Sequence, residues 1–395
     1  MKTLLVIFGI TGDLSTRKLL PALGHIINEE KALGLSILGV SRRELDVKHL
    51  IIETTSNQRL ADSAESVTMD VASIDDYVKL KNYITAQAPD KVLIYLAVPP
   101  GAAAQIVDLL GEAGVNDSTV NLLFEKPFGF DLASAQDFIS RTARYFHETQ
   151  LYRIDHYMGK EVAADLLRLR RNADTEHHHW GAHSVSAVTI VASEAIGIEG
   201  RLQFYEQTGA LRDFVQGHLM QLLSLVLATK PTIDEDLPAQ RLRALEAVAG
   251  ADPLMAVRGQ YEGYAEEAEN PGSNVETFVS IKLRSNDPHW QGVPIRLVTG
   301  KALSEKRSYV EVVYKDGRSD VFEEGIGPAE SGRRLDAYER VLLEAIAGRK
   351  ELFTSSEEVI RSWQILADIQ RTWDMDDTPI AIYKPGAQLT TVLSD

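Results

Sequence analysis

The chain of 395 residues contains no cysteine and no long hydrophobic run. The absence of cysteine excludes disulfides, thiolate metal sites and a cysteine nucleophile, and it is typical of a reducing compartment. No apolar stretch approaches the ~18 residues that a membrane-spanning helix requires. The apolar start is short, lacks a cleavage site and enters a glycine turn, so it predicts a buried strand rather than a signal peptide. We therefore expect a soluble, cytoplasmic protein.

Positive charge is also scarce. The 41 Lys and Arg residues are outnumbered by 57 Asp and Glu, which gives a formal net charge of -16 at pH 7. Nucleic acid and anionic membrane surfaces would repel such a chain, so neither is expected as the main partner. Any anionic ligand must instead meet a local cluster of basic side chains. The 44% hydrophobic and 25% charged composition is that of a globular protein, and the length predicts at least two domains.

Two patterns of secondary structure divide the chain near residue 152. Before it, short apolar runs alternate with helical patterns, which predicts βαβ units and a Rossmann-like parallel sheet in residues 1–152. After it, strands and long helices are segregated, which predicts an α+β domain with a largely antiparallel sheet and flanking helices in residues 153–395. The predicted strands are 3–8, 36–40, 66–69, 91–96 and 120–124, then 184–193, 275–284, 293–298 and 308–314. The predicted helices are 15–30, 74–86, 101–112 and 132–146, then 158–171, 212–229, 334–347 and 355–373.

The stretch FGITGDLSTRK follows the first predicted strand and opens a helix. Gly9 and Gly12 would let the backbone approach a pyrophosphate, which the free N–H groups of a helix N-terminus can bind. The spacing departs from G-x-G-x-x-G, and a tight βα turn without a ligand is the alternative. The second strand ends in GVSRRE, where an NAD-binding fold usually has an acid. The guanidinium group of Arg42 suits the 2′-phosphate of NADP and therefore favours NADP. The alternative is a solvated pair of arginines on a loop, with no role in binding.

Two further motifs, YLAVPP at 95–100 and FEKPFGFD at 124–131, follow predicted strands. The carboxyl ends of parallel strands form the edge of the sheet at which ligands bind. Lys126 precedes Pro127, which disfavours helix in its predecessor and would hold this lysine extended towards a substrate or a nicotinamide. A purely structural turn is the alternative.

The stretch RIDHYMGKE, residues 153–161, has the densest ionisable chemistry in the chain. Asp155, His156 and Tyr157 are predicted at a strand-to-helix corner, with Lys160 one turn later. His156 and Lys160 are four residues apart and can share one face, which would suit a phosphate dianion. Asp155 only accepts hydrogen bonds and cannot favour that anion, so it must serve another group. His218 is the candidate.

His218 lies in the predicted helix LRDFVQGHLMQLLSLVLA, in the middle of one apolar stripe. A histidine on such a stripe is more often a hydrogen-bonded core residue, and that is the alternative. An aspartate that fixes its tautomer would instead make it a general base at neutral pH. The stripe is formed by Leu211, Phe214, Val215, Leu222 and Val226.

Seven motifs resemble, in order and in local wording, those of the glucose-6-phosphate dehydrogenase family. They are GITGDLSTRKLLPAL, YLAVPP, EKPFG, YRIDHYMGKE, GALRDFVQGHLMQ, GKAL and DAYERVLLEAI. The resemblance covers nearly the whole chain, and RIDHY-x-GKE is its most specific part. It implies oxidation of D-glucose 6-phosphate at C1 to 6-phospho-D-glucono-1,5-lactone, the first step of the oxidative pentose phosphate pathway. NADP, or in some members NAD, would accept the hydride.

The resemblance also implies a role for particular residues. His218 resembles the general base and Asp155 the carboxylate that orients it, with no metal required. The implied substrate-binding residues are His156, Tyr157 and Lys160 for the phosphate, Glu194 and Asp213 for sugar hydroxyls, and Lys126, Lys301 and Lys306 around the substrate. The implied coenzyme-binding residues are Gly9, Thr11, Gly12, Asp13, Leu14 and Lys18 in the loop, Ser41 and Arg42 near the 2′-phosphate, and Lys126 between coenzyme and substrate.

Part of the chain departs from the family pattern. After residues 304–325 the chain quickly reaches RRLDAYER, where most relatives carry additional strands of the sheet on which they dimerise. We therefore expect a compact family member and a homodimer that is weakened by the shortened sheet. The histidines at 177–179, with His183, look like a metal cluster, but adjacent histidines cannot all converge on one ion, so no metal is expected.

Two other functions fit parts of the sequence. A different Rossmann oxidoreductase acting on a sugar or polyol could share the E-K-P turn and the antiparallel sheet, but it would not need RIDHY-x-GKE. If the chain were a non-catalytic protein that binds NADP or a sugar phosphate, we would expect the base, its orienting carboxylate or the phosphate-binding group to be lost. None of the three is lost here.

Overall fold

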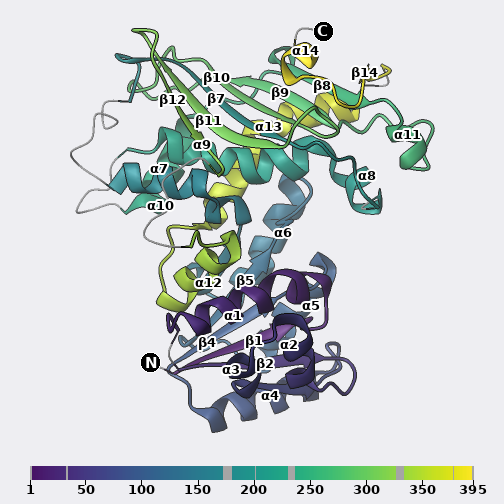
Figure 1. Cartoon of the computed structure of the whole chain (residues 1–395), viewed down its shortest axis with the longest axis vertical. Coiled ribbons are helices and arrows are strands. Elements are labelled where there is room, and N and C mark those ends of the chain that lie inside the picture. The colour runs from purple at the N-terminus through teal and green to yellow at the C-terminus, as the bar shows by residue number, and fades with distance from the viewer. Residues whose placement is uncertain are drawn as a thin grey trace. The chain divides into compact units, whose positions relative to one another are not determined.

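The computed structural model of the chain describes residues 2–32, 34–171, 180–200, 202–229, 236–325, 333–376 and 378–393. The chain forms two compact units, each with a seven-stranded sheet (Figure 1). The first unit comprises Met1–Phe128, Ala135–Gly159 and Arg333–Ser356. The second comprises Gly129–Ser134, Lys160–Gly332 and Glu357–Asp395. The mixed fold class predicted from the sequence is confirmed.

The sheet of the first unit has the strand order β13-β6-β5-β4-β1-β2-β3. Strands β1 to β6 are parallel, and β13 pairs antiparallel with β6. The carboxyl ends of β1 to β6 therefore share one edge, and the strand order reverses between β1 and β4, where such sheets bind ligands. The strands are β1 (Thr3–Phe8), β2 (Leu35–Ser41), β3 (Ala64–Thr68), β4 (Lys91–Leu96), β5 (Val120–Glu125), β6 (Leu151–Ile154) and β13 (Phe353–Thr354).

The central strands β1 and β4 are nearly continuous apolar runs and are almost fully buried. All six residues of β1 are buried, as a parallel sheet requires. All five strands predicted here are present, and each end lies within two residues of its predicted position. The connecting helices are η1 (Ser15–Leu19), α1 (Leu20–Asn28), α2 (Val47–Thr55), α3 (Gln58–Asp62), α4 (Ile74–Gln87), α5 (Pro100–Glu112), α6 (Leu132–Ala143) and η2 (Glu148–Gln150).

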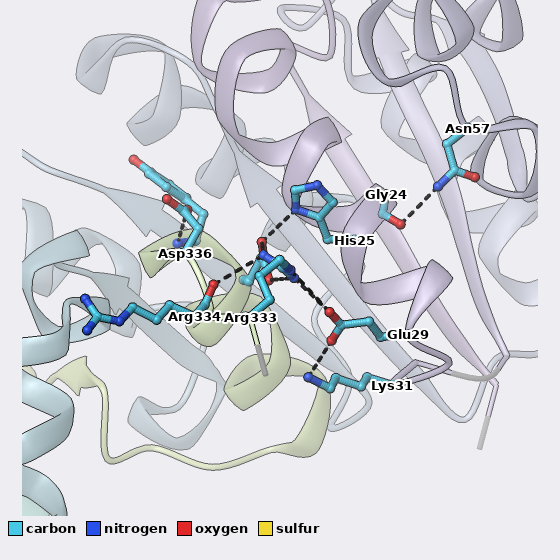
Figure 2. A network of polar contacts seen from close by, with 10 residues as sticks. Gly24, His25, Glu29, Lys31, Asn57, Arg333, Arg334 and Asp336 are labelled. Atoms are coloured by element: carbon cyan, nitrogen blue, oxygen red, sulfur yellow. Dashed lines mark hydrogen bonds and ion pairs between the residues drawn. The ribbon is translucent and has the colours of Figure 1, made fainter. Parts of the chain in front are cut away.

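A segment from late in the chain completes the first unit. Helix α12 (Ala337–Ala347) packs against α1, and β13 joins the edge of the sheet. Figure 2 shows the polar network that fixes this segment: Arg333 donates to Glu29 at 3.0 Å and to the buried Glu339 at 2.7 Å. His25 Nδ1 lies 2.8 Å from the same Glu339 carboxyl. The periodicity of residues 334–347 predicted the helix but not its association with the first sheet. The boundary at residue 152 stays a prediction.

The sheet of the second unit has the order β12-β11-β7-β10-β9-β8-β14. The pairs β7–β10 and β8–β14 are parallel and the other four are antiparallel, so the largely antiparallel sheet is confirmed. The strands are β7 (Val185–Ser193), β8 (Ala256–Tyr261), β9 (Phe278–Leu283), β10 (Ile295–Gly300), β11 (Arg307–Tyr314), β12 (Ser319–Glu323) and β14 (Ala381–Tyr383). The sequence patterns did not predict β8, β12 and β14.

Helices of the second unit pack on one face of this sheet, where α7, α9, α10 and α13 gather in Figure 1. The side chains of the strands that face them are fully buried, with Ile190, Ile281, Leu297 and Val310 at 0% exposure. The helices of this unit are α7 (Glu161–Arg171), α8 (Leu202–Ala210), η5 (Leu211–Leu219), α9 (Met220–Leu227), α10 (Leu237–Ala247), η6 (Pro253–Met255), α11 (Tyr264–Glu267), α13 (Ser356–Asp374) and α14 (Leu389–Val392), and η3 (His156–Gly159), which precedes α7, belongs to the first unit. Among the described residues, none of the helices is long and apolar enough to cross a membrane.

Candidate active site

The glycine loop after β1 is shaped by a close approach between two strand ends. Gly9 has a φ of +80°, and a Cβ at this position would lie 2.4 Å from the carbonyl oxygen of Ala97, just after β4. The N–H of Gly12 and the hydroxyl of Ser15 donate to the Gly9 carbonyl at 2.9 and 2.8 Å. Only glycine fits at position 9, and the loop is thereby fixed at the point where the strand order reverses.

The other predicted residues of this loop present mostly exposed side chains. Thr11, Asp13 and Lys18 are exposed and Leu14 is partly buried. The Asp13 carboxylate lies 3.4 Å from the Arg17 guanidinium, a pair that is too exposed to contribute much stability. The loop runs directly into η1 and α1, so free N–H groups at the start of this helix face the edge of the sheet. A helix start and a glycine cradle that a Cβ would fill suit a pyrophosphate.

The end of β2 carries the predicted 2′-phosphate residues. Ser41 is the last residue of the strand, and Arg42 and Arg43 are exposed after it. The Ser41 hydroxyl accepts the Arg43 N–H at 3.3 Å. Of the two acids that follow, Glu44 is exposed, and Asp46 caps α2 by accepting the His49 N–H at 3.0 Å. That carboxylate is committed to the helix, and the strand end presents guanidinium groups.

Lys126 follows β5 at the same edge of the sheet. It is partly buried, and its peptide bond to Pro127 is cis. The residue before it, Glu125, ends the strand and accepts a hydrogen bond from the hydroxyl of Tyr95 in the neighbouring β4. Sequence reasoning missed both of these residues, although Glu125 lies within the quoted E-K-P motif.

The segment RIDHYMGKE divides into residues that anchor the corner and residues that face the site. Arg153 is fully buried and donates to Glu148 at 2.7 Å and to the Ser356 hydroxyl at 2.6 Å. A Cβ on Gly159 would lie 2.4 Å from the Ala337 carbonyl oxygen, so glycine is required for α12 to approach. The Gly159 carbonyl in turn accepts from Arg340 at 2.9 Å. These two residues of the motif serve packing.

Asp155, His156 and Tyr157 lie together in the turn between β6 and α7. One carboxylate oxygen of Asp155, which is buried, accepts the Tyr157 N–H at 2.9 Å. The His156 ring lies 5.2 Å from the Tyr157 ring and stacks parallel to the Tyr338 ring at 6.4 Å. Lys160 is partly buried and immediately precedes α7. Tyr338 belongs to the motif DAYERVLLEAI, but no role was predicted for it. Its contact with His156 joins positions that are far apart in the chain, so local sequence patterns cannot show it.

In the second unit, the parallel pair β7–β10 brings two predicted residues together. Ser193 and Gly300 are paired in register, so the next residues, Glu194 and Lys301, leave the sheet side by side. The Lys301 ammonium lies 2.5 Å from a Glu194 carboxylate oxygen. It also lies 5.2 Å from the ring centre of Tyr205 and 5.8 Å from that of Phe214. Tyr205, a buried aromatic residue in this cluster, was not predicted.

Helix η5 carries Asp213 and His218, and it differs from the helix predicted for residues 212–229. Its hydrogen bonding is of the wider π type, as the Met220 N–H donates to the Val215 carbonyl, and π segments are frequent at functional sites. All five residues of the predicted apolar stripe are buried, and burial extends beyond the stripe to eight of the nine residues of η5, Asp213 and His218 among them. The helix lies under the second sheet and has little solvent face. The rings of Phe214 and His218 meet edge to face at 5.3 Å.

A buried carboxylate fixes the start of this helix. Near the end of α8, just before η5, the chain kinks at Gly209, which has a φ of +58°. A Cβ there would lie 2.4 Å from Glu276 Oε1, and the same oxygen accepts the Leu211 N–H at 2.8 Å. Burial raises the pKa of Glu276. Glu276 thus caps η5 from another part of the chain, a role that only the tertiary structure reveals.

The remaining predicted residues lie apart from these clusters. Lys306 is exposed just before β11. The histidines at 177–179 lie outside the described residues, and the ring of His183 lies 6.2 Å from that of His289. Asp155 and His218 belong to different units, and their meeting stays a prediction.

Comparisons with known proteins bear on this arrangement. Residues 6–165 match the family model described as "Glucose-6-phosphate dehydrogenase, NAD binding domain", and residues 167–331 and 326–392 match "Glucose-6-phosphate dehydrogenase, C-terminal domain". The chain is 32% identical to a glucose-6-phosphate 1-dehydrogenase of Dickeya dadantii over 97% of this chain and 93% of the relative. It is 30% identical to one of Rhizobium meliloti, over 96% and 93%.

Solved structures give the same picture. A glucose-6-phosphate 1-dehydrogenase from Mycobacterium avium is 31% identical with a TM-score of 0.84, covering 98% of this chain and 95% of that one. A glucose-6-phosphate dehydrogenase in complex with glucose 6-phosphate has a TM-score of 0.89 at 24% identity, over 100% and 97%, and shows the shared fold. The Dickeya alignment runs over 467 residues, more than the 395 of this chain, so that relative has internal residues without a counterpart here.

Proposed function

Because this chain belongs to the glucose-6-phosphate dehydrogenase family, we propose that it oxidises D-glucose 6-phosphate at C1 to 6-phospho-D-glucono-1,5-lactone with NADP as the hydride acceptor. The observation that carries the proposal is the corner at Asp155–Lys160. Its carboxylate, imidazole and phenol are held at the carboxyl edge of the sheet whose first loop is the glycine cradle. A coenzyme in that cradle and a substrate at this corner would share one edge of the first unit.

The chemistry needs one base and no metal. As hydride leaves C1, the carbon becomes electron-poor, and removal of the C1 hydroxyl proton relieves that charge. We assign the proton to His218 and the orientation of the imidazole to Asp155, whose carboxylate is already fixed by the Tyr157 N–H. NADP, when bound, supplies the hydride acceptor. Base catalysis of this kind typically contributes about 10²–10⁴-fold, and the rest comes from positioning.

The phosphate of the substrate would be bound by His156, Tyr157 and Lys160. The stacking of His156 on Tyr338 and the anchoring of Gly159 to α12 hold this group in place before a ligand arrives. Binding energy from a remote phosphate can be used to position the reacting end of a substrate, so Lys160 should affect turnover as well as affinity.

The sugar hydroxyls would meet residues of the second unit. Glu194 and Asp213 offer acceptors, and Lys301 offers donors beyond the one that it gives to Glu194. The aromatic rings of Tyr205 and Phe214 hold the Lys301 ammonium in place. Lys126 would lie between coenzyme and substrate, and Lys306 would reach the substrate from its exposed position before β11.

The preference for NADP rests on the end of β2. Ser41 and Arg42 are available for a 2′-phosphate, whereas the nearby Asp46 carboxylate is engaged as a helix cap. Arg42→Ala should raise the KM for NADP at least tenfold and leave the KM for NAD within a factor of three. Equal increases in the KM for NADP and the KM for NAD would contradict the assignment of Arg42 to the 2′-phosphate.

A homodimer through the outer face of the second sheet is the proposed assembly. One row across this face runs through Lys282, Arg296, Thr189, Glu311 and Val321. The row mixes charges with an apolar side chain that is 50% exposed, which is the composition of a weak interface. Sedimentation equilibrium over a range of concentrations tests this, and a monomer at all of them would contradict it.

The decisive experiment follows the absorbance of reduced nicotinamide with glucose 6-phosphate, glucose and other sugar phosphates, each with NADP or NAD. Turnover should require the phosphate and be fastest with glucose 6-phosphate. His218→Asn should abolish turnover and spare substrate binding, measured by calorimetry. Lys160→Ala should weaken the binding of glucose 6-phosphate and leave the slow oxidation of unphosphorylated glucose unchanged. A different preferred sugar phosphate would overturn the substrate, and wild-type turnover in His218→Asn would overturn the base.

A further inference from the structure

The loop that carries Lys301, residues 301–304, is tied to the C-terminal strand of the second sheet. Strand β14 is the edge strand next to β8 (Figure 1), and just after it the Gly386 N–H donates to the Ala302 carbonyl at 2.7 Å. Ala302 has a φ of +49°, a conformation that L residues rarely adopt, so the loop needs such contacts to keep its shape. No residue of β14 enters the function proposed above.

The hydroxyl of Tyr383, the last residue of β14, reaches the main chain of Lys301. It lies 2.7 Å from the Lys301 carbonyl oxygen, 2.9 Å from Thr277 Oγ1 and 3.3 Å from the Thr277 carbonyl oxygen. Thr277 Oγ1 already accepts the Tyr261 N–H at 2.9 Å, so its own proton can be donated to Tyr383. The Tyr383 proton is then donated to Lys301. Thr277 and Tyr383 are buried, where the loss of one member of such a chain of hydrogen bonds is costly.

Lys301 is fixed at each of its polar atoms. Its N–H donates to the Thr277 carbonyl at 2.9 Å, and its carbonyl accepts the Tyr383 hydroxyl. Its ammonium lies 2.5 Å from Glu194 and faces the ring of Tyr205. Burial raises the pKa of Tyr383, so this hydroxyl stays protonated and able to donate. A shift of the main chain at Lys301 would move the ammonium away from these partners.

We propose that Tyr383 is a positioning residue that holds Lys301 where its ammonium can donate to a hydroxyl of the bound sugar. This rests on the proposed function for the role of Lys301. Tyr383 acts through the main chain of Lys301 and not through a contact of its own with the substrate. The affinity for the sugar thus depends on a strand 82 residues further along the chain.

The expected signature is a selective loss of affinity for the sugar. Tyr383→Phe keeps the buried ring and removes the hydroxyl, so the KM for glucose 6-phosphate should rise about three- to tenfold, the equivalent of one hydrogen bond. The kcat should stay within about a factor of two, because a contact that stabilises the bound substrate and the transition state equally changes KM alone. The KM for NADP should not change.

Tyr314→Phe is the matched control in the same sheet. The Tyr314 hydroxyl donates to Asp320 at 2.7 Å and accepts the Trp180 indole N–H at 2.7 Å, so this variant also loses buried or partly buried hydrogen bonds. Tyr314 pairs with Val185 at the start of β7, whereas Glu194 follows the end of that strand. The KM for glucose 6-phosphate should therefore stay within about a factor of two of the wild type.

A double-mutant cycle separates positioning from a merely structural role. Lys301→Ala should raise the KM for glucose 6-phosphate more than Tyr383→Phe does. Adding Tyr383→Phe to Lys301→Ala should then change that KM by less than about twofold, because the side chain that Tyr383 positions is gone. An unchanged KM in Tyr383→Phe, or the same factor in both backgrounds, would overturn the proposal. If Tyr383→Phe does not fold, Thr277→Val decides by the same criteria, since it keeps the shape of the side chain and removes the donor to Tyr383.

Hydrogen exchange without substrate distinguishes a failure of this inference from a failure of the proposed function. The four N–H groups of residues 301–304 are all hydrogen-bonded, so they should exchange slowly in the wild type and about fivefold faster or more in Tyr383→Phe, but not in Tyr314→Phe. If exchange is faster in Tyr383→Phe but no sugar phosphate is oxidised, the support of Lys301 stands and the proposed function fails. If exchange is unchanged, the inference fails whatever the enzyme oxidises.

Discussion

The loop proposed to bind the coenzyme, residues 9–18, and the corner proposed to bind the substrate, residues 153–160, both follow the carboxyl ends of parallel strands in the first sheet. They are built differently. The loop is shaped by its own backbone, with Gly9 fitted against the Ala97 carbonyl and its polar side chains largely exposed. The corner is shaped by side chains from distant segments, as Arg153 reaches Ser356 and Gly159 receives Ala337 and Arg340.

This difference separates two kinds of binding site. A site that uses backbone N–H groups needs only a strand, a glycine and a helix start, which lie next to each other in the sequence. A site that uses oriented side chains must fix their rotamers, and most of the residues that do so are remote in the sequence. The substrate corner should therefore be more sensitive than the loop to changes far from the ligand.

The largest expected effect is at the chemical end of the corner. Asp155→Asn keeps the shape and can still accept the Tyr157 N–H, but it removes the charge that would stabilise the base. We expect kcat to fall by about 10²–10⁴-fold with little change in the KM for NADP, measured in steady state. An equal loss in coenzyme affinity would mean that the loop and the corner are not separable.

The next effect is on stability. Arg153→Met leaves Glu148 without its buried partner and breaks the link to Ser356, so the free energy of unfolding should fall by about 2–4 kcal/mol in urea titrations. Arg168→Met is the control, since Arg168 pairs with Asp165 on an exposed helix surface and its loss should cost under about 0.5 kcal/mol. Similar values for both variants would show that the corner does not depend on its anchor.

A change in the loop should affect the coenzyme alone. Gly9→Ala forces a Cβ against the Ala97 carbonyl at a positive φ, which should raise the KM for NADP at least tenfold, since such backbone strain costs about 1–3 kcal/mol. Gly101→Ala, at the start of α5 with open space around its Cα, should leave that KM within a factor of two. If Gly9→Ala raised the KM for glucose 6-phosphate more than the KM for NADP, the assignment of this loop to the coenzyme would be contradicted.

The smallest effect is a pH dependence behind the corner. Lys350 donates to the Leu151 carbonyl at 2.7 Å and covers the Tyr152 ring, and burial lowers its pKa to about 7. In the unfolded chain a lysine stays protonated up to about pH 10.4, so the unfolded state binds more protons between these values and stability should rise with pH from about 7 to 10. Because Lys350 is only partly buried, solvent screening reduces the effect, and Lys350→Met should lower that rise by about 1 kcal/mol, measured by urea titration at several pH values. A slope identical to the wild type would contradict the assignment.

Much of the fold follows from local patterns. Buried parallel strands appear as continuous apolar runs, and β1 and β4 were predicted to the residue. The strands β8, β12 and β14 were missed because they are edge or near-edge strands of the second sheet with mixed composition, such as RGQ in β8 and SDVFE in β12. Helices α2 and α3 were not predicted, because each is short and its apolar pattern is correspondingly weak.

The candidate site divides in the same way. The glycine loop, the arginines after β2 and the RIDHY-x-GKE corner could be found because each combines its signals within about ten residues. Tyr95, Glu125, Tyr205, Glu276 and Tyr338 could not be given roles, because a buried tyrosine or glutamate is recognisable only by what surrounds it. The burial of His218 could not be predicted for a related reason: helical periodicity shows the apolar stripe but cannot show that polar positions on the same helix are buried as well.

The sequence by itself determined the family, the parallel sheet, the glycine loop and the order of the site motifs, because strand patterns, turn glycines and local wording depend on neighbouring residues. Tertiary structure alone decided that residues 333–356 return to the first sheet, that Glu276 caps η5, and that the Tyr95 hydroxyl donates to Glu125. The reason is that burial and charge act through space at a few ångströms, where residues hundreds of positions apart are neighbours.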